Sequence, residues 1–97
     1  MPYYVALVNW TDQGIRNVKD SVKRGDALIA TAEKLRCKVR HLFYTMGPHD
    51  IVTVIEAPND QAVSTLTLSM GALGYVRTLT MRAYEKEEME GILSGLA

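Results

Sequence analysis

The first apolar run of the chain, YYVALVNW at residues 3–10, has hydrophobic side chains at both odd and even positions. The run is too short for a typical helix and is rich in valine and aromatic residues, which predicts a β-strand. Successive side chains of a strand point to opposite faces of a sheet. A strand that is apolar on both parities needs cover on both faces, and this need restricts the possible folds more than any other feature of the sequence.

Three further strands and two helical segments are predicted after this run. The strands cover residues 38–45, 50–57 and 75–83, and the turn Met46-Gly47-Pro48 joins the first two of these as an antiparallel hairpin. The second helix begins at a cap on Asn59 and ends at Gly74. The first helix follows Thr11-Asp12, with a break near Asn17 or Gly25 as an open alternative. Its predicted buried stripe is Ile15, Val18, Val22, Gly25, Ile29 and Ala32, and its predicted solvated face includes Arg16, Lys23 and Arg24.

The order of these elements is βαββαβ, followed by a short terminal helix. This order predicts an α+β fold of the ferredoxin-like class, a single domain over residues 1–97 with four antiparallel strands and both helices on one face. The other face of such a sheet is bare, yet the strands at 3–10 and 50–57 are apolar there too. A second copy packed face to face would cover it, so we expect a homodimer, a dimeric α/β barrel, or a higher homo-oligomer.

Charge and cysteine content limit the partners. Eleven basic and eleven acidic side chains cancel, so we expect neither nucleic acid nor a membrane surface as a partner. Cys37 is the one cysteine, and a single thiol cannot form an internal disulfide. The N-terminal run is a poor secretion signal and no segment approaches a membrane span. We therefore expect a cytoplasmic protein.

The chain as a whole resembles the GYD-domain family. The resemblance rests on YVALVNWTDQGIRNVKDSVKRGDA, LFYTMGPHDIVTVIEAPND and GYVRTLTMRAYE. It implies the ferredoxin-like fold and homo-oligomerisation, and it implies no reaction. The motif of the family resembles Gly-any-Tyr-Asp; Gly47 and Asp50 match it, while His49 stands where the motif has tyrosine. The chain also departs from the family at Arg36 and Cys37, where small residues such as glycine are expected.

Five residues are the candidate ligand-binding positions, and no cofactor or metal is expected. The histidines and the aspartate have no established metal-ligand spacing, and no phosphate-loop or nucleophile motif occurs. Asp50 could equally accept backbone N–H bonds at the hairpin, and an aromatic lining from Tyr4, Trp10, Tyr44 and Tyr75 could equally be core packing. The candidates are Trp10, His41, His49, Asp50 and Arg82.

Three functions remain open from the sequence. The first is a homo-oligomeric module that binds a small molecule or serves as an assembly unit. The second is a cofactor-independent enzyme of the monooxygenase or isomerase type, with His41 or His49 as general base and an arginine or Asn9 at the oxyanion. The third is a metabolite-sensing regulator that contacts other proteins through its C-terminal tail.

Overall fold

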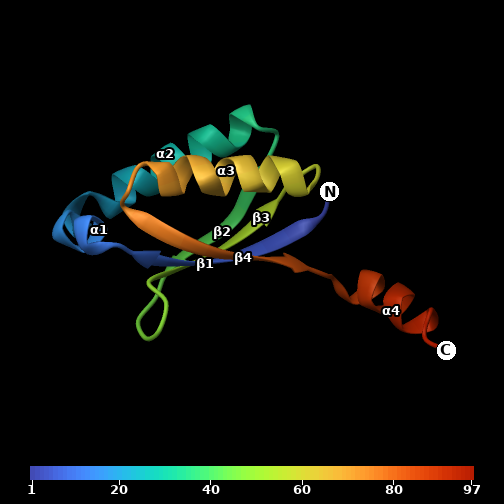
Figure 1. The fold of residues 1–97 in the computed structure, drawn as a ribbon. Coiled ribbons are helices and arrows are strands. Elements are labelled where there is room, and N and C mark those ends of the chain that lie inside the picture. Colours follow the sequence, from blue (N-terminus) through green and yellow to red (C-terminus); the bar gives the residue numbers. More distant parts are fainter.

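A computed structural model of residues 1–97 has the predicted order of elements (Figure 1). The elements are β1 (Tyr3–Trp10), α1 (Asp12–Arg16), the 3₁₀ turn η1 (Val18–Asp20), α2 (Ser21–Lys34), β2 (Lys38–Tyr44), β3 (Ile51–Glu56), α3 (Asp60–Ala72), β4 (Val76–Ala83) and α4 (Lys86–Ser94). No helix among them has the combination of length and apolar character that crossing a membrane requires.

The four strands form one sheet in the order β2-β3-β1-β4, and every neighbouring pair is antiparallel. Helices α2 and α3 lie side by side over one face, and the opposite face carries no element (Figure 1). This arrangement confirms the ferredoxin-like α+β fold. The terminal helix α4 projects from the end of β4, away from the two-layered body (Figure 1).

The hydrophobic core lies between the sheet and the two long helices. On β1 the side chains of Tyr4, Ala6 and Val8 are buried. Tyr4 belongs to a buried cluster with Leu66 of α3 and Cys37, the two largest side chains that are fully buried. Burial raises the pKa of the Cys37 thiol, so this cysteine stays protonated at neutral pH and acts as a packing residue.

The predicted stripe of the first helix is wrong at four of its six positions. Of its large hydrophobic members, Ile15, Val18, Val22 and Ile29 are all exposed. The helix ends at Asn17, whose backbone leaves the helical region with φ of −107° and ψ of 27°. The side-chain amide of Asn17 donates to the Gln13 carbonyl. A 3₁₀ turn follows, with 3.0 residues per turn instead of 3.6. The prediction is confirmed at Gly25 and Ala32, which face inward. The inward side of α2 is completed by Ser21, Leu28 and Leu35.

Strand β2 contains a β-bulge that the sequence did not predict. The regular alternation of a strand would place Val39, His41 and Phe43 on one face, but the register shifts between Val39 and His41. Val39 lies opposite Ile55 on the helix side and packs against the core, whereas His41 lies opposite Val54. A bulge adds one residue to one strand and re-aims the side chains beyond it.

Two glycines permit close contact between layers. A Cβ on Gly14 would lie 1.9 Å from the Tyr75 carbonyl oxygen, so α1 packs directly on the backbone that begins β4. A Cβ on Gly25 would lie 2.8 Å from the Tyr44 hydroxyl oxygen. Glycine at residue 25 therefore lets α2 approach β2 closely.

The ends of the two long helices differ. Gly74, with φ of 88°, follows α3 in the left-handed conformation that glycine adopts readily. Arg36 follows α2 with φ of 60° and is the one non-glycine residue with positive φ. The small residue expected at this position is thus explained by the backbone, which is left-handed here.

Candidate interaction surface

The sheet face opposite the helices carries two nearly complete apolar rows. Leu7 pairs with Val52 and with Leu79, and Val52 pairs with Phe43. Directly opposed residues of antiparallel strands point to the same face, so these four side chains cross all four strands. The neighbouring row consists of His41, Val54, Val5 and Met81. We call these eight residues the open face.

The open face is exposed although it is apolar. Phe43 is 56% exposed, Leu79 is 57% exposed and Met81 is 44% exposed. The four central residues of the open face are half-buried; they are Val5, Leu7, Val52 and Val54. Contiguous apolar patches of this kind mark interaction sites in soluble proteins.

An ion pair borders the open face at one end. Arg40 Nε lies 2.6 Å from Glu56 Oε1, the cross-strand pairing expected of a strand arginine. Glu56 is 8% exposed. The hydrogen bond from Arg40, together with a second from Tyr3, lowers the pKa of Glu56 below its ordinary value. This carboxylate is therefore charged and paired at the rim of the apolar rows.

His49 and Asp50 fasten the β2–β3 hairpin to the end of β1. Asp50 Oδ2 accepts a hydrogen bond of 3.0 Å from the Trp10 backbone N–H, and its own N–H donates to the Val8 carbonyl. His49 Nδ1 lies 2.9 Å from Asn9 Oδ1. Asn9 Nδ2 donates to the Pro48 carbonyl. These side chains position the turn at the rim of the open face.

His41 and Arg82 lie apart from that turn. His41 is exposed on the open face, where its ring stacks on Phe43 with centroids 5.7 Å apart. Arg82 stands at the opposite end of the sheet, beside Tyr4 and Tyr84, with its guanidinium 4.7 Å from the Tyr84 ring.

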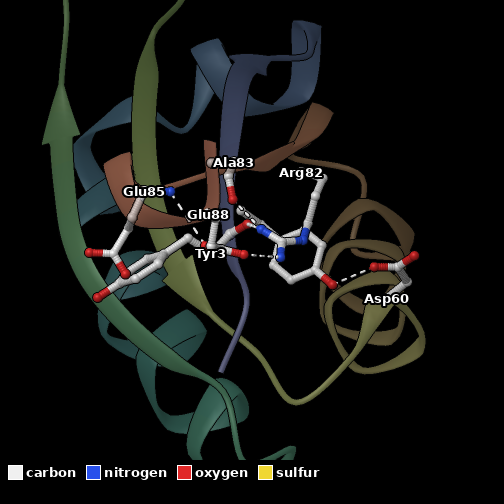
Figure 2. A network of polar contacts seen from close by, with 7 residues as sticks. Tyr3, Asp60, Arg82, Ala83, Glu85 and Glu88 are labelled. Carbon is white, nitrogen blue, oxygen red and sulfur yellow. Dashed lines mark hydrogen bonds and ion pairs between the residues drawn. The ribbon is translucent and has the colours of Figure 1, made fainter. Parts of the chain in front are cut away.

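The Arg82 guanidinium fixes the start of α4, as Figure 2 shows. It donates to Glu88 Oε2 at 2.8 Å, to the Tyr3 carbonyl at 3.3 Å and to the Ala83 carbonyl. The hydrogen bond from Arg82 lowers the pKa of Glu88. The other carboxylate oxygen of Glu88 accepts a hydrogen bond from the Glu85 backbone N–H in a capping box. Arg82 is therefore occupied in holding the base of the projecting helix.

Tyr4 anchors the same end of the molecule from inside the core. Its hydroxyl donates to Asp60 Oδ1 at the start of α3. Burial, reinforced by this bond, raises the pKa of Tyr4 to about 12. The predicted aromatic lining is thus divided, because Tyr4 is a core residue while the other three members border a separate cavity.

That cavity measures about 100 Å³ and lies between the sheet and the long helices. Trp10 lines it, and neither histidine does, so the general base expected of an enzyme is not placed there. No three histidine, cysteine or acidic side chains come together as a metal site. The structure brings Trp10, His49 and Asp50 together and leaves His41 and Arg82 elsewhere.

Sequence reasoning missed one surface. It placed Arg24 on a solvated face, whereas Arg24 borders the cavity; the helix break that moves it gave no clear signal. The C-terminal tail, by contrast, was expected to contact other proteins in one of the three candidate functions. In the structure Met89, Ile92, Leu93 and Leu96 are all exposed on or just beyond α4.

The four-stranded antiparallel sheet and the two helices on one face define a small ferredoxin-like α+β domain. The family model for the GYD domain matches residues 4–93, and the chain belongs to this family.

One curated relative and one solved structure extend the comparison, both from Thermus thermophilus. One is named glutamine synthetase and cystathionine beta-lyase binding protein; it is 27% identical over 84 residues, which are 86% of this chain and 88% of that protein. The other is the crystal structure of TTHA0845, with a TM-score of 0.57 and 20% identity over 88% of this chain and 95% of that chain. The second comparison shows a shared fold.

Proposed function

We propose that the protein is a homodimeric assembly module that joins through its open face and binds a partner protein through α4. The observation that carries the proposal is the pair of rows that cross all four strands with seven apolar side chains and His41. A second copy of the same rows, related by a two-fold axis, matches them in shape and chemistry.

The size of the whole sheet face fits this role. Strands spaced about 4.8 Å apart and side-chain rows about 6.8 Å apart give the two rows of the open face a flat area of roughly 260 Å², and the sheet face with one further row on each side roughly 500 Å². A stable interface buries about 800 Å² on each partner. Side-chain relief and the hairpin turn at the rim would supply the remainder, so the sheet provides most of a dimer interface.

The partner surface is assigned to α4 because this helix is exposed and amphipathic. Ile92 is 44% exposed and Leu93 is 50% exposed, although α4 is anchored at its base by Arg82 and Glu88. An amphipathic helix of this kind binds by laying its apolar side into a groove on the partner. The name of the Thermus relative supports a protein partner and suggests glutamine synthetase or cystathionine beta-lyase as the first ones to test.

Sedimentation velocity of the protein mixed with each of these enzymes, taken from the same organism, tests the proposal. We expect a complex with at least one of them, and we expect Ile92→Glu to abolish it while the protein alone keeps its dimer mass. Glu90→Gln, on the same helix, is the matched control and should bind as the wild type does.

Two outcomes would contradict the proposal. If neither enzyme forms a complex, α4 does not have the assigned role. If Ile92→Glu converts the protein alone to a monomer, α4 belongs to the dimer interface and not to a partner surface.

A further inference from the structure

The cavity between the sheet and the helices is not used by the proposed assembly. Fourteen of its twenty lining residues are hydrophobic, among them Val8, Leu28 and Leu66. An engineered apolar cavity of about 150 Å³ takes up benzene. The space of about 100 Å³ seen here is of the same order, which suits a ligand with a single ring or an apolar group of that size.

One end of the cavity is aromatic and reaches the surface. Trp10, Tyr44 and Tyr75 all line it. Tyr44 is 44% exposed, and Leu73 on the α3 side is 56% exposed. A ligand could therefore enter between α2 and the start of β4 and meet aromatic rings on its way.

Arg24 brings a positive charge to this end. Its guanidinium lies 4.5 Å from the centroid of the Tyr75 ring, with Nη1 bonded to the Asn17 carbonyl at 3.0 Å and Nη2 to Ser21 Oγ at 3.1 Å. A guanidinium has five N–H donors, so three remain. No carboxylate lies within 4.0 Å of it, because the three ion pairs of the chain involve other residues.

The positive charge of Arg24 affects the ionisation of Tyr44 at the rim of the cavity. Burial raises the pKa of the Tyr44 phenol, the Asp26 carboxylate adds to that rise, and the nearby Arg24 guanidinium opposes it. An arginine beside an apolar space, without an acidic partner, can bind a carboxylate through two parallel hydrogen bonds.

We propose that the cavity binds a small monocarboxylate whose apolar part is about the size of one aromatic ring. The ring occupies the space between the sheet and the helices, and the carboxylate binds the free donors of Arg24. The site is independent of the open face, so each protomer of an assembly carries its own. This inference goes beyond the proposed function and does not depend on it.

Fluorescence of Trp10 tests the proposal, because Trp10 is the only tryptophan and lines the cavity. The probe is sodium benzoate at constant ionic strength, compared with benzamide, its neutral analogue. We expect a saturable change with benzoate and at least about tenfold weaker binding of benzamide, equivalent to about 1.4 kcal/mol. No saturable change with benzoate up to about 10 mM, well above a weak dissociation constant near 1 mM, would overturn the proposal.

Two pairs of variants locate the site. Arg24→Gln should weaken benzoate binding at least about tenfold and leave benzamide unchanged, while Arg16→Gln, on exposed α1 outside the cavity, should change neither. Thr67→Phe should fill the cavity and abolish both, while Thr65→Phe, exposed on the same helix, should not. Equal effects within either pair would overturn the assignment.

An NMR measurement on the wild-type protein tests the site without relying on variants that could fail to fold. Benzoate should shift backbone amide resonances of residues that line the cavity, such as Ser21 and Gly25, in a two-dimensional NMR spectrum. Shifts confined to the open face would place the ligand elsewhere and contradict the proposal. A protein that dimerises but shows neither fluorescence nor NMR response would refute this inference and leave the assembly proposal standing.

Discussion

The two faces of the sheet are built from the same four strands but meet different surroundings. On the helix side, Tyr4 and Ala6 are 3% and 2% exposed. On the other side, Phe43 and Leu79 are 56% and 57% exposed, although they are as apolar. The comparison teaches that hydrophobic content on a strand predicts that a face will be covered, but not whether the same chain or a second one covers it.

Truncation in the helix-covered core should have the largest effect on stability. Leu66 is fully buried in the core cluster, so Leu66→Ala should lower the free energy of unfolding by about 2–5 kcal/mol through lost burial and a new cavity. Urea unfolding measured at one fixed protein concentration checks this value. Leu68→Ala, on the same helix but 73% exposed, should change it by less than about 0.5 kcal/mol. Equal losses would mean that the core is not where the structure places it.

Charge on the open face should break assembly and spare the fold. Leu79 points to solvent in a single subunit, so Leu79→Lys costs little there but would leave a buried, unpaired ammonium in the dimer. We expect dimer dissociation to increase at least about 100-fold, equivalent to about 2.7 kcal/mol, with unchanged far-UV circular dichroism. Size-exclusion chromatography with light scattering over a dilution series checks this.

The control for that variant is Leu68→Lys, which places the same charge on α3. It should leave the dimer intact. If Leu79→Lys also stays dimeric, the subunits join through some other surface, and the open face is not the dimer interface.

The rim of the open face should make stability depend on acid pH. Arg40 holds the folded-state pKa of Glu56 below the ordinary 4.5, so the ionised carboxylate stabilises the fold above that pH. This stabilisation is lost as pH falls from about 4.5 through the lowered pKa. Thermal unfolding of Glu56→Gln between pH 7 and pH 3 should therefore decline less steeply than that of the wild type. Glu90→Gln, which is exposed on α4, should follow the wild type; parallel curves for all three proteins would contradict this account.

The end of α2 should give the smallest effect, and in the stabilising direction. Arg36 adopts φ of 60°, a conformation that costs a non-glycine residue roughly 1 kcal/mol relative to glycine. Arg36→Gly should therefore raise the free energy of unfolding by about 0.5–1 kcal/mol. Lys34→Gly, inside the last turn of α2, should lower it by a similar amount. A destabilised Arg36→Gly protein would show that the Arg36 side chain contributes more than the backbone costs.

The contrast between the two faces was readable from the sequence because β-strands alternate strictly. Tyr3 to Trp10 is apolar on both parities, and the hairpin turn at Gly47-Pro48 fixed the pairing of β2 with β3. The helical stripe was not readable in the same way. The backbone leaves the helical conformation at Asn17 and continues as a 3₁₀ turn, which changes which side chains of α2 face the sheet. The side chain of Asn17 bonds locally to the Gln13 carbonyl, a contact that the spacing of apolar residues does not reveal.

The candidate site was predicted only in part, because contacts between residues far apart in the sequence leave no local pattern. Residues adjacent in sequence, such as His49 and Asp50, were expected together and are together. Arg24 and Trp10 meet at one cavity because α2 crosses over the sheet, and their separation in sequence gave no sign of it. The bulge in β2 likewise re-aims His41 through pairing with β3, which no local pattern in KVRHLFYT announces.

The central claim is that the open face is covered by a second copy of the chain. Sedimentation equilibrium of the unmodified protein at micromolar concentration tests it most directly. The account predicts a mass at least twice the 10.8 kDa of one chain. A single species of 10.8 kDa across the concentration range would contradict it, because the apolar rows from β2 to β4 would then face water unaided.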